Sequence, residues 1–315
     1  MKCQILSLMK RIVFTSTLAS LVLATGCTSN KKELGSEGNP IKLHFVPSVD
    51  AKVIENNSKA FKEYLEKTTG YKFEITIPQS YVAVVEAFGT KRADIAAMNS
   101  GGYLLANEKY GAEARMTVIR NGQSTYSGMI VTKKDGPIKK IEDLAGKKVA
   151  FVDPMSTSGY LLPLKMLKDK HIEPKETVFA LKHDNVISMV YQGQVDAGAA
   201  FFSPPSKNDK GEDVVEDARR LVKAQYPDIE SKVAIIGMSE QIPNDPFIFR
   251  KDMPEEMKSK IVDAMMKFVE TPEGKVAFKA IYGVTGLKLA TDADYNPMRE
   301  TLKTIGKSAE DIMKK

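Results

Sequence analysis

The chain has 315 residues, 43% of them hydrophobic, and a formal net charge of +6 from 46 basic and 40 acidic side chains. Three positive side chains, Lys2, Lys10 and Arg11, lie in the first 26 residues, so the remainder carries about +3. Basic and acidic residues are interspersed, which gives no support to a nucleic-acid-binding function. The length and apolar content are sufficient for two ordinary domains.

The N-terminus has the features of a lipoprotein export signal. The basic residues precede an apolar stretch over 12–24 that is too short to span a bilayer. The stretch ends in LVLATGC, where small residues stand directly before Cys27, the thiol that would accept a lipid such as palmitate. An uncleaved anchor and an ordinary cleavage site are the alternatives. We predict a signal peptide over 1–26 and a chain that is exported and lipid-anchored to a bacterial membrane, facing the periplasm or the cell exterior.

The segment after the signal is expected to be a tether. Cys3 and Cys27 are the two cysteines of the sequence, so the residues after Cys27 cannot form an internal disulfide. Residues 28–39 read TSNKKELGSEGN, which is polar, contains glycine and serine, and has no apolar periodicity. We therefore expect a lipidated cysteine and flexible tether over 27–40, with folding beginning near Ile41.

In the next part of the chain, strand-type apolar runs alternate with amphipathic helical runs. The predicted strands are 41–47, 71–77, 93–98 and 115–119, and the predicted helices are 53–68, 81–89 and 102–108. Such a βαβ order predicts an α/β fold with a mainly parallel sheet flanked by helices.

The alternation resumes after a longer extended run. The predicted strands are 126–133, 148–152, 177–181, 197–201 and 232–238, and the predicted helices are 141–144, 157–170, 186–192, 254–270 and 273–281, with a charged loop at 206–213. The extended runs at 126–133 and 232–238 bracket a middle block, as if the chain crosses to a second lobe and returns. We expect one lobe from 41–126 plus 239–315, a second from 127–238, a hinge at the crossings, and a ligand cleft at the carboxyl ends of the strands.

The most informative stretch is VAFVDPMSTSGY over 149–160. A buried-type strand is followed by a turn and by the hydroxyls of Ser156, Thr157 and Ser158 at the start of a helix. The free amides and positive dipole end of a helix start, together with hydroxyl donors, suit an anion without any full positive charge. Ordinary helix capping is the alternative explanation.

Four further residues are candidates for the same site. His183 lies between a strand and a helix and can donate to an anion. Tyr81 and Tyr126 can present hydroxyls at the ends of rigid rings, and Asp245 can accept from a ligand hydroxyl. Taken singly, these residues are explained equally well by capping, core packing and turn chemistry.

Several segments together resemble one protein family. They are YVAVVE at 81–86, RADIAA at 92–97, IEDLAGKK at 141–148, the stretch at 149–160, HDNVISMVYQGQVDAGA at 183–199, Pro243–Pro246 with Arg250, and Tyr295–Pro297. The chain resembles, over nearly its whole length after the export signal, the PhnD-like phosphate, phosphite and phosphonate binding proteins of ABC importers.

This resemblance implies a two-lobed type II periplasmic-binding fold that closes on its ligand. It implies an oxyanion site formed by Ser156, Thr157, Ser158, Tyr81, Tyr126 and His183, with Asp245 as the acidic residue of the cleft. It also implies an ABC permease and its ATPase as partners, no cofactor or metal, and a monomer.

Two positions depart from the family's pattern. Ser203 stands where members that take aminoalkyl phosphonates have a carboxylate, so a cationic tail would lack its partner. The ligand is therefore expected to be phosphate, phosphite or a simple alkylphosphonate. The loop at 99–102 lacks the usual glycine-led form, which leaves contacts from the first lobe open.

Other classes of protein are weighed against this one. The sequence has no Gly-x-Ser-x-Gly or His-Glu-x-x-His motif, so an enzyme is not expected. A ligand-binding component of a sensory system, and a type II binder for an unrelated small solute, remain alternatives.

Overall fold

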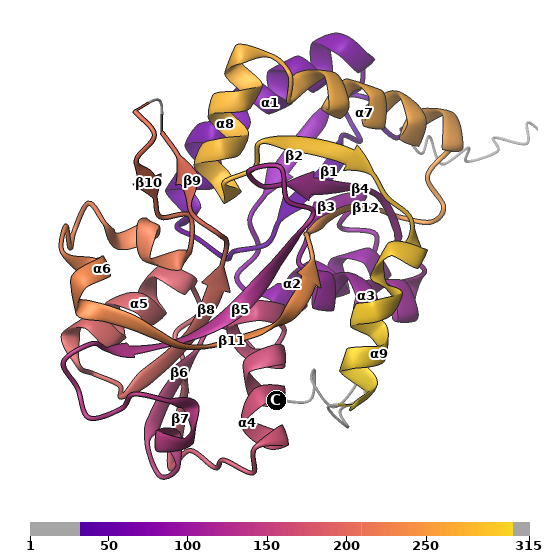
Figure 1. Ribbon diagram of the computed structural model, residues 1–315. Helices are drawn as coiled ribbons and strands as arrows, with labels where there is room; N and C mark the ends of the chain where they lie inside the picture. Colours follow the sequence, from indigo (N-terminus) through magenta and orange to yellow (C-terminus); the bar gives the residue numbers. More distant parts are fainter. Residues whose placement is uncertain (1–31, 209, 305–315) are drawn as a thin grey trace, which may run out of the picture. The chain divides into compact units, whose positions relative to one another are not determined.

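The computed structural model describes residues 32–208 and 210–304, and the strands within them form two large mixed sheets and one short hairpin (Figure 1). The first sheet has the order β13-β4-β12-β3-β1-β2. Its strands are β1 (Ile41–Phe45), β2 (Phe73–Thr76), β3 (Ile95–Ala97), β4 (Glu113–Ile119), β12 (Pro246–Phe249) and β13 (Gly286–Leu289). Strand β1 pairs in parallel with β2 and β3, and β12 and β13 add antiparallel pairs. The sequence pattern predicts neither β12 nor β13, each of which is four residues long.

The second sheet has the order β11-β5-β8-β6-β7. Its strands are β5 (Thr125–Lys133), β6 (Lys148–Phe151), β7 (Glu176–Phe179), β8 (Ala197–Phe202) and β11 (Val233–Pro243). Strand β6 pairs in parallel with β7 and β8, whereas β5 pairs antiparallel with β8 and β11. The charged loop contains the short hairpin of β9 (Ser206–Lys207) and β10 (Asp213–Val214).

Helices cover both faces of the first sheet. They are α1 (Ala51–Thr69), α2 (Tyr81–Gly89), α3 (Ser100–Tyr110), α7 (Glu255–Phe268), α8 (Pro272–Tyr282) and α9 (Asn296–Thr304), with a short 3-10 turn η4 (Asp292–Tyr295). Successive residues of β3 belong to different hydrophobic clusters: Ile95 packs with the cluster of α1, α7 and α8, and Ala96 with that of α2 and α3. Because side chains alternate along a strand, the two helix groups lie on opposite faces.

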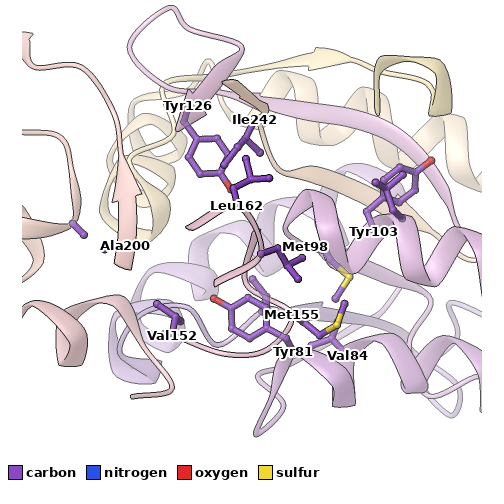
Figure 2. Close-up of a cluster of buried hydrophobic side chains, with 14 of the residues drawn as sticks. Tyr81, Val84, Met98, Tyr103, Tyr126, Val152, Met155, Leu162, Ala200 and Ile242 are labelled. Atoms are coloured by element: carbon purple, nitrogen blue, oxygen red, sulfur yellow. The ribbon is translucent and has the colours of Figure 1, made fainter. Parts of the chain in front are cut away.

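The second sheet is flanked by α4 (Leu162–Asp169), α5 (His183–Gln192) and α6 (Ile229–Lys232), and by short turns η1 (Ile141–Leu144), η2 (Thr157–Leu161) and η3 (Ala218–Val222). One cluster of buried side chains contains residues from the elements of both sheets. Figure 2 shows Met98 and Val84 from the first group with Val152 and Met155 from the second. Within the described residues, no helix is both long and apolar enough to cross a bilayer.

The chain crosses between the two sheets at the ends of the paired strands β5 and β11. Strands β5 and β11 pair antiparallel from Thr125 opposite Pro243 to Lys133 opposite Val233 (Figure 1). The chain therefore leaves the first sheet through 120–124 and returns through 244–245. These positions lie slightly outside the lobe boundaries expected at 126 and 239, because the pairing of β5 with β11 continues up to the crossings.

The chain is folded before Ile41, so the expected tether is too long at its C-terminal end. Gly35 donates its amide to the carbonyl of Asn39 at 2.8 Å, and its own carbonyl accepts from the amide of Lys72 at 2.8 Å. Leu34 packs against the core, and the compact unit begins at Glu33. These hydrogen bonds fix a polar segment in which the sequence shows no apolar periodicity. The signal peptide and Cys27 lie outside the described residues.

Glycine at position 128 allows β5 to lie directly against the start of η2. A Cβ atom added to Gly128 would stand 2.7 Å from the backbone oxygen of Ser158. A Cβ added to Gly286 in β13 would instead meet its nearest atom, Cβ of Ile119, at an ordinary 3.6 Å.

We predict that Gly128→Ala lowers the free energy of unfolding by about 1–3 kcal/mol, because backbone atoms must shift to admit the methyl group. The matched strand variant Gly286→Ala should change it by less than about 0.5 kcal/mol. Urea unfolding of both variants measures this, and equal stabilities would contradict the close approach.

Candidate functional site

A polar cavity lies where several helices of both lobes begin. Tyr81 is the first residue of α2, Asn99 is the N-cap of α3, Ser156 is the N-cap of η2, and His183 is the first residue of α5. All four line the cavity together with Val46, Ser48, Val49, Arg120, Tyr126, Ser158, Phe201, Ser203, Arg220, Asp245 and Tyr282. Helix starts present free amides and a positive dipole end, so their convergence favours an anion.

The cavity is small. Its volume is about 50 Å³, several times the roughly 10–15 Å³ that one water requires. It therefore suits a ligand of a few heavy atoms.

The hydroxyl-rich stretch forms the start of a helix, as the sequence predicts. Ser156 accepts a hydrogen bond from the amide of Gly159 at 3.1 Å, which caps η2, and η2 is a π turn that continues directly into α4. Single π turns inside helices are frequent at functional sites. Ser156 and Ser158 line the cavity, and each is at most 2% exposed.

Thr157 does not line the cavity but joins the two lobes. Its Oγ1 accepts from Asn99 Nδ2 and from the amide of Gly101, both at 2.9 Å. Asn99 Nδ2 also donates to the carbonyl of Met155 at 2.7 Å. The loop at 99–102 thus supplies contacts from the first lobe, which the sequence had left open.

A second contact between the lobes involves Asp153, directly after β6. Its carboxylate accepts from the amide of Met155 at 2.8 Å and from the amide of Tyr81 at the start of α2. Burial raises the pKa of Asp153, and these hydrogen bonds oppose the rise.

His183 is buried and neutral in the cavity wall. Burial, with a smaller contribution from the Arg120 charge, lowers its pKa to about 3. Its ring meets Phe201 edge to face at 5.0 Å, and within the described residues its Nδ1 has no hydrogen-bond partner. A buried polar atom without a partner in the cavity wall is available for a ligand.

Tyr81 and Tyr126 pack in the hydrophobic core and also line the cavity. Figure 2 shows both rings within the buried cluster that joins the lobes. Burial raises the pKa of both hydroxyls well above the usual value, so they remain neutral donors. Tyr126 donates to Asp245 Oδ1 at 3.4 Å.

Asp245 is paired with an arginine that sequence reasoning missed. Arg120 Nη2 donates to Asp245 Oδ2 at 2.7 Å, and Arg120 Nε donates to the carbonyl of Tyr282 at 2.9 Å. Arg120 lies in the first crossing and Asp245 in the second, so this ion pair ties the two crossings together. The carboxylate expected to receive a ligand hydroxyl is therefore already occupied by Arg120 and Tyr126.

Two positively charged residues, Arg120 and Arg220, line the cavity beside the neutral donors that the sequence predicts. The charge of Arg120 is balanced by Asp245, whereas Arg220 has no ion pair among the residues that the structure describes. No local motif marks either arginine, since each reaches the site only through the tertiary fold. Ser203 also lines the cavity, where the family resemblance places it.

Two mixed α/β sheets linked by two crossings, with a polar cavity lined by both lobes, define a type II periplasmic binding protein. The model of the family "ABC transporter, phosphonate, periplasmic substrate-binding protein" matches residues 43–295. The chain belongs to this family, which confirms the expectation of an exported transport component and not an enzyme.

Individual relatives agree with this assignment. The chain is 26% identical to the phosphate-import protein PhnD of Mycolicibacterium smegmatis over 93% of this chain and 96% of that one. It is 24% identical to the phosphonates-binding periplasmic protein of Escherichia coli over 76% of this chain and 69% of the other. The structure of PhnD1 from Prochlorococcus marinus in complex with methylphosphonate superposes with a TM-score of 0.71 at 17% identity, covering 85% and 98% of the two chains.

The lowered pKa of His183 predicts a pH dependence of stability. The unfolded chain protonates this histidine below about pH 6.5 and the folded chain only near pH 3, so acid favours unfolding over that range. Between pH 7 and pH 5 the free energy of unfolding should fall by about 2 kcal/mol more in the wild type than in His183→Gln.

Urea unfolding at the two pH values measures this difference. His171→Gln removes an exposed histidine from the same lobe and should follow the wild type. An equally steep loss of stability in His183→Gln would show that His183 is not the group responsible.

Proposed function

We propose that this chain captures phosphate, phosphite or a simple alkylphosphonate in the cavity and delivers it to the permease and ATPase of an ABC importer. The observation that carries the proposal is the convergence of helix starts from both lobes on one small cavity. Hydroxyls of Ser156, Ser158 and Tyr81, and the imidazole of His183, add neutral donors there. Such donors stabilise an oxyanion that has lost its water.

Relatives named for related ligands support a phosphorus oxyanion as the ligand. One relative is named for phosphate import and another for phosphonate binding, and a similar structure contains methylphosphonate. Sulfate has a similar shape, so comparison with sulfate tests whether the site prefers phosphorus oxyanions.

Closure of the lobes is part of the proposed mechanism. The anion docks on the helix start at Ser156–Ser158, and bending at the two crossings brings Tyr81 and Asn99 over it. The hydrogen bonds of Thr157 with Asn99 and Gly101 exist only while the lobes touch. Thr157 therefore acts by stabilising the closed form, although it does not line the cavity.

Thermal shift and calorimetric titration with phosphate, phosphite, methylphosphonate and sulfate test this function. We expect at least one phosphorus oxyanion to raise the melting temperature and to bind more tightly than sulfate. Thr157→Val should weaken that binding by more than about tenfold, because the closed form then contains donors without an acceptor.

Ser188→Ala is the control, since Ser188 lies on α5 of the same lobe but outside the cavity lining. It should bind like the wild type. No shift with any phosphorus oxyanion, or tighter binding of sulfate, would overturn the proposed function; an unchanged affinity in Thr157→Val would overturn the role of closure.

We further propose that Cys27 carries a lipid that anchors the chain to the membrane, on the strength of the LVLATGC sequence at the end of the apolar stretch. Metabolic labelling with radioactive palmitate should mark the wild type and Cys3→Ser but not Cys27→Ser. Label retained in Cys27→Ser would contradict lipidation at this cysteine.

A further inference from the structure

Arg220 is a positively charged residue of the cavity wall. It lies in η3 and lines the cavity, and its Nε is buried without a hydrogen-bond partner. Within the described residues, no ion pair or hydrogen bond of its guanidinium is found, whereas the adjacent Arg219 is paired with Asp217 at 2.8 Å. Burial lowers the pKa of Arg220, but a guanidinium stays charged in proteins.

The nearby acidic groups form no ion pair with Arg220, although the charges of Glu216 and Asp217 help to keep its pKa from falling further. Glu216 accepts a hydrogen bond from Ser206 at 2.6 Å, and Asp245, the one carboxylate in the lining formed by the described residues, is held by Arg120 at 2.7 Å. A buried charge without a partner is costly. Arg220 has no ion pair of its own within the described residues and is therefore available to pair with an anionic group of the ligand.

The guanidinium of Arg220 lies close to the other lobe. Its Nη2 is 3.0 Å from the point that a Cβ on Gly283 would occupy, at the C-terminal end of α8. The negative dipole end of that helix therefore lies beside the guanidinium. Phe201 and Ser203, from the end of β8, line the same cavity and bring no charge.

We propose that Arg220 is a specificity residue that binds a second acidic group on the ligand, so that the preferred substrates are phosphonates with a short carboxylate tail. This inference rests on the proposed function. In it, the helix starts hold the phosphonate group and Arg220 holds the carboxylate in a bidentate pair. A cationic amine on the tail is rejected, because it meets a like charge and finds no free carboxylate.

Calorimetric titration of the purified full-length chain with three phosphonates tests the inference. Phosphonoacetate carries an anionic tail, ethylphosphonate a neutral one, and 2-aminoethylphosphonate a cationic one. The wild type should bind phosphonoacetate at least about tenfold more tightly than ethylphosphonate, and 2-aminoethylphosphonate at least about tenfold more weakly.

Arg220→Gln should abolish the preference for phosphonoacetate while changing ethylphosphonate affinity by less than about threefold. Lys223→Gln removes one positive charge from the exposed residue just after η3 and should leave the order unchanged. If Arg220→Gln does not fold, Ser203→Asp provides a second variant, because a carboxylate in the lining would pair with Arg220 and shift the preference toward 2-aminoethylphosphonate.

The outcomes separate the two proposals. Absence of binding by any phosphonate or by phosphate would overturn the proposed function itself. Binding of ethylphosphonate with no preference for phosphonoacetate in the wild type, or a preference that survives in Arg220→Gln, would overturn the role of Arg220 and leave the capture function standing.

Discussion

Replacement of the water around a small anion is the constraint on which this structure depends. A dry cavity must supply donors from several directions, since an ion without them is expelled. Here the donors come from the starts of α2, α3, η2 and α5, where backbone amides lack partners within their own helices. The parallel strand pairs in each sheet make this possible, because they place the strand ends and following helix starts on the cavity side. The same arrangement of strands and helix starts thus determines both the fold and the chemistry of the cavity.

The two lobes contribute unequally to that arrangement. The second lobe provides Ser156, Ser158, His183 and Arg220, while the first provides Tyr81, Asn99 and contacts that close the site. Hydrogen bonds of Thr157 and Asp153 join the two lobes. The Arg120–Asp245 pair lies instead at the crossings, where it joins the two chain segments. The contacts between the lobes and the ion pair at the crossings thus lie at different places in the molecule.

Much of this architecture can be predicted from the sequence, because periodicity and helix-start chemistry are local. The helix at 81–89, the turn at 141–144 and the hydroxyl-rich start after β6 are where the pattern places them. The short strands β12 and β13 escape prediction, since pairing with β4 defines them more than composition does. Of the cavity residues, Ser156, Ser158 and His183 stand in recognisable strand-to-helix contexts. Arg120 and Arg220 do not, and only the tertiary fold brings them together; the same is true of the contact between Thr157 and Asn99.

The most direct test is a crystal structure of the chain grown with methylphosphonate. The phosphonate oxygens should lie about 2.6–3.2 Å from the hydroxyls of Ser156 and Ser158 and from a ring nitrogen of His183. Thr157 should accept from Asn99 in the same crystal. A phosphonate bound outside this cavity, or bound in it while the lobes stand apart, would contradict capture by helix starts of both lobes.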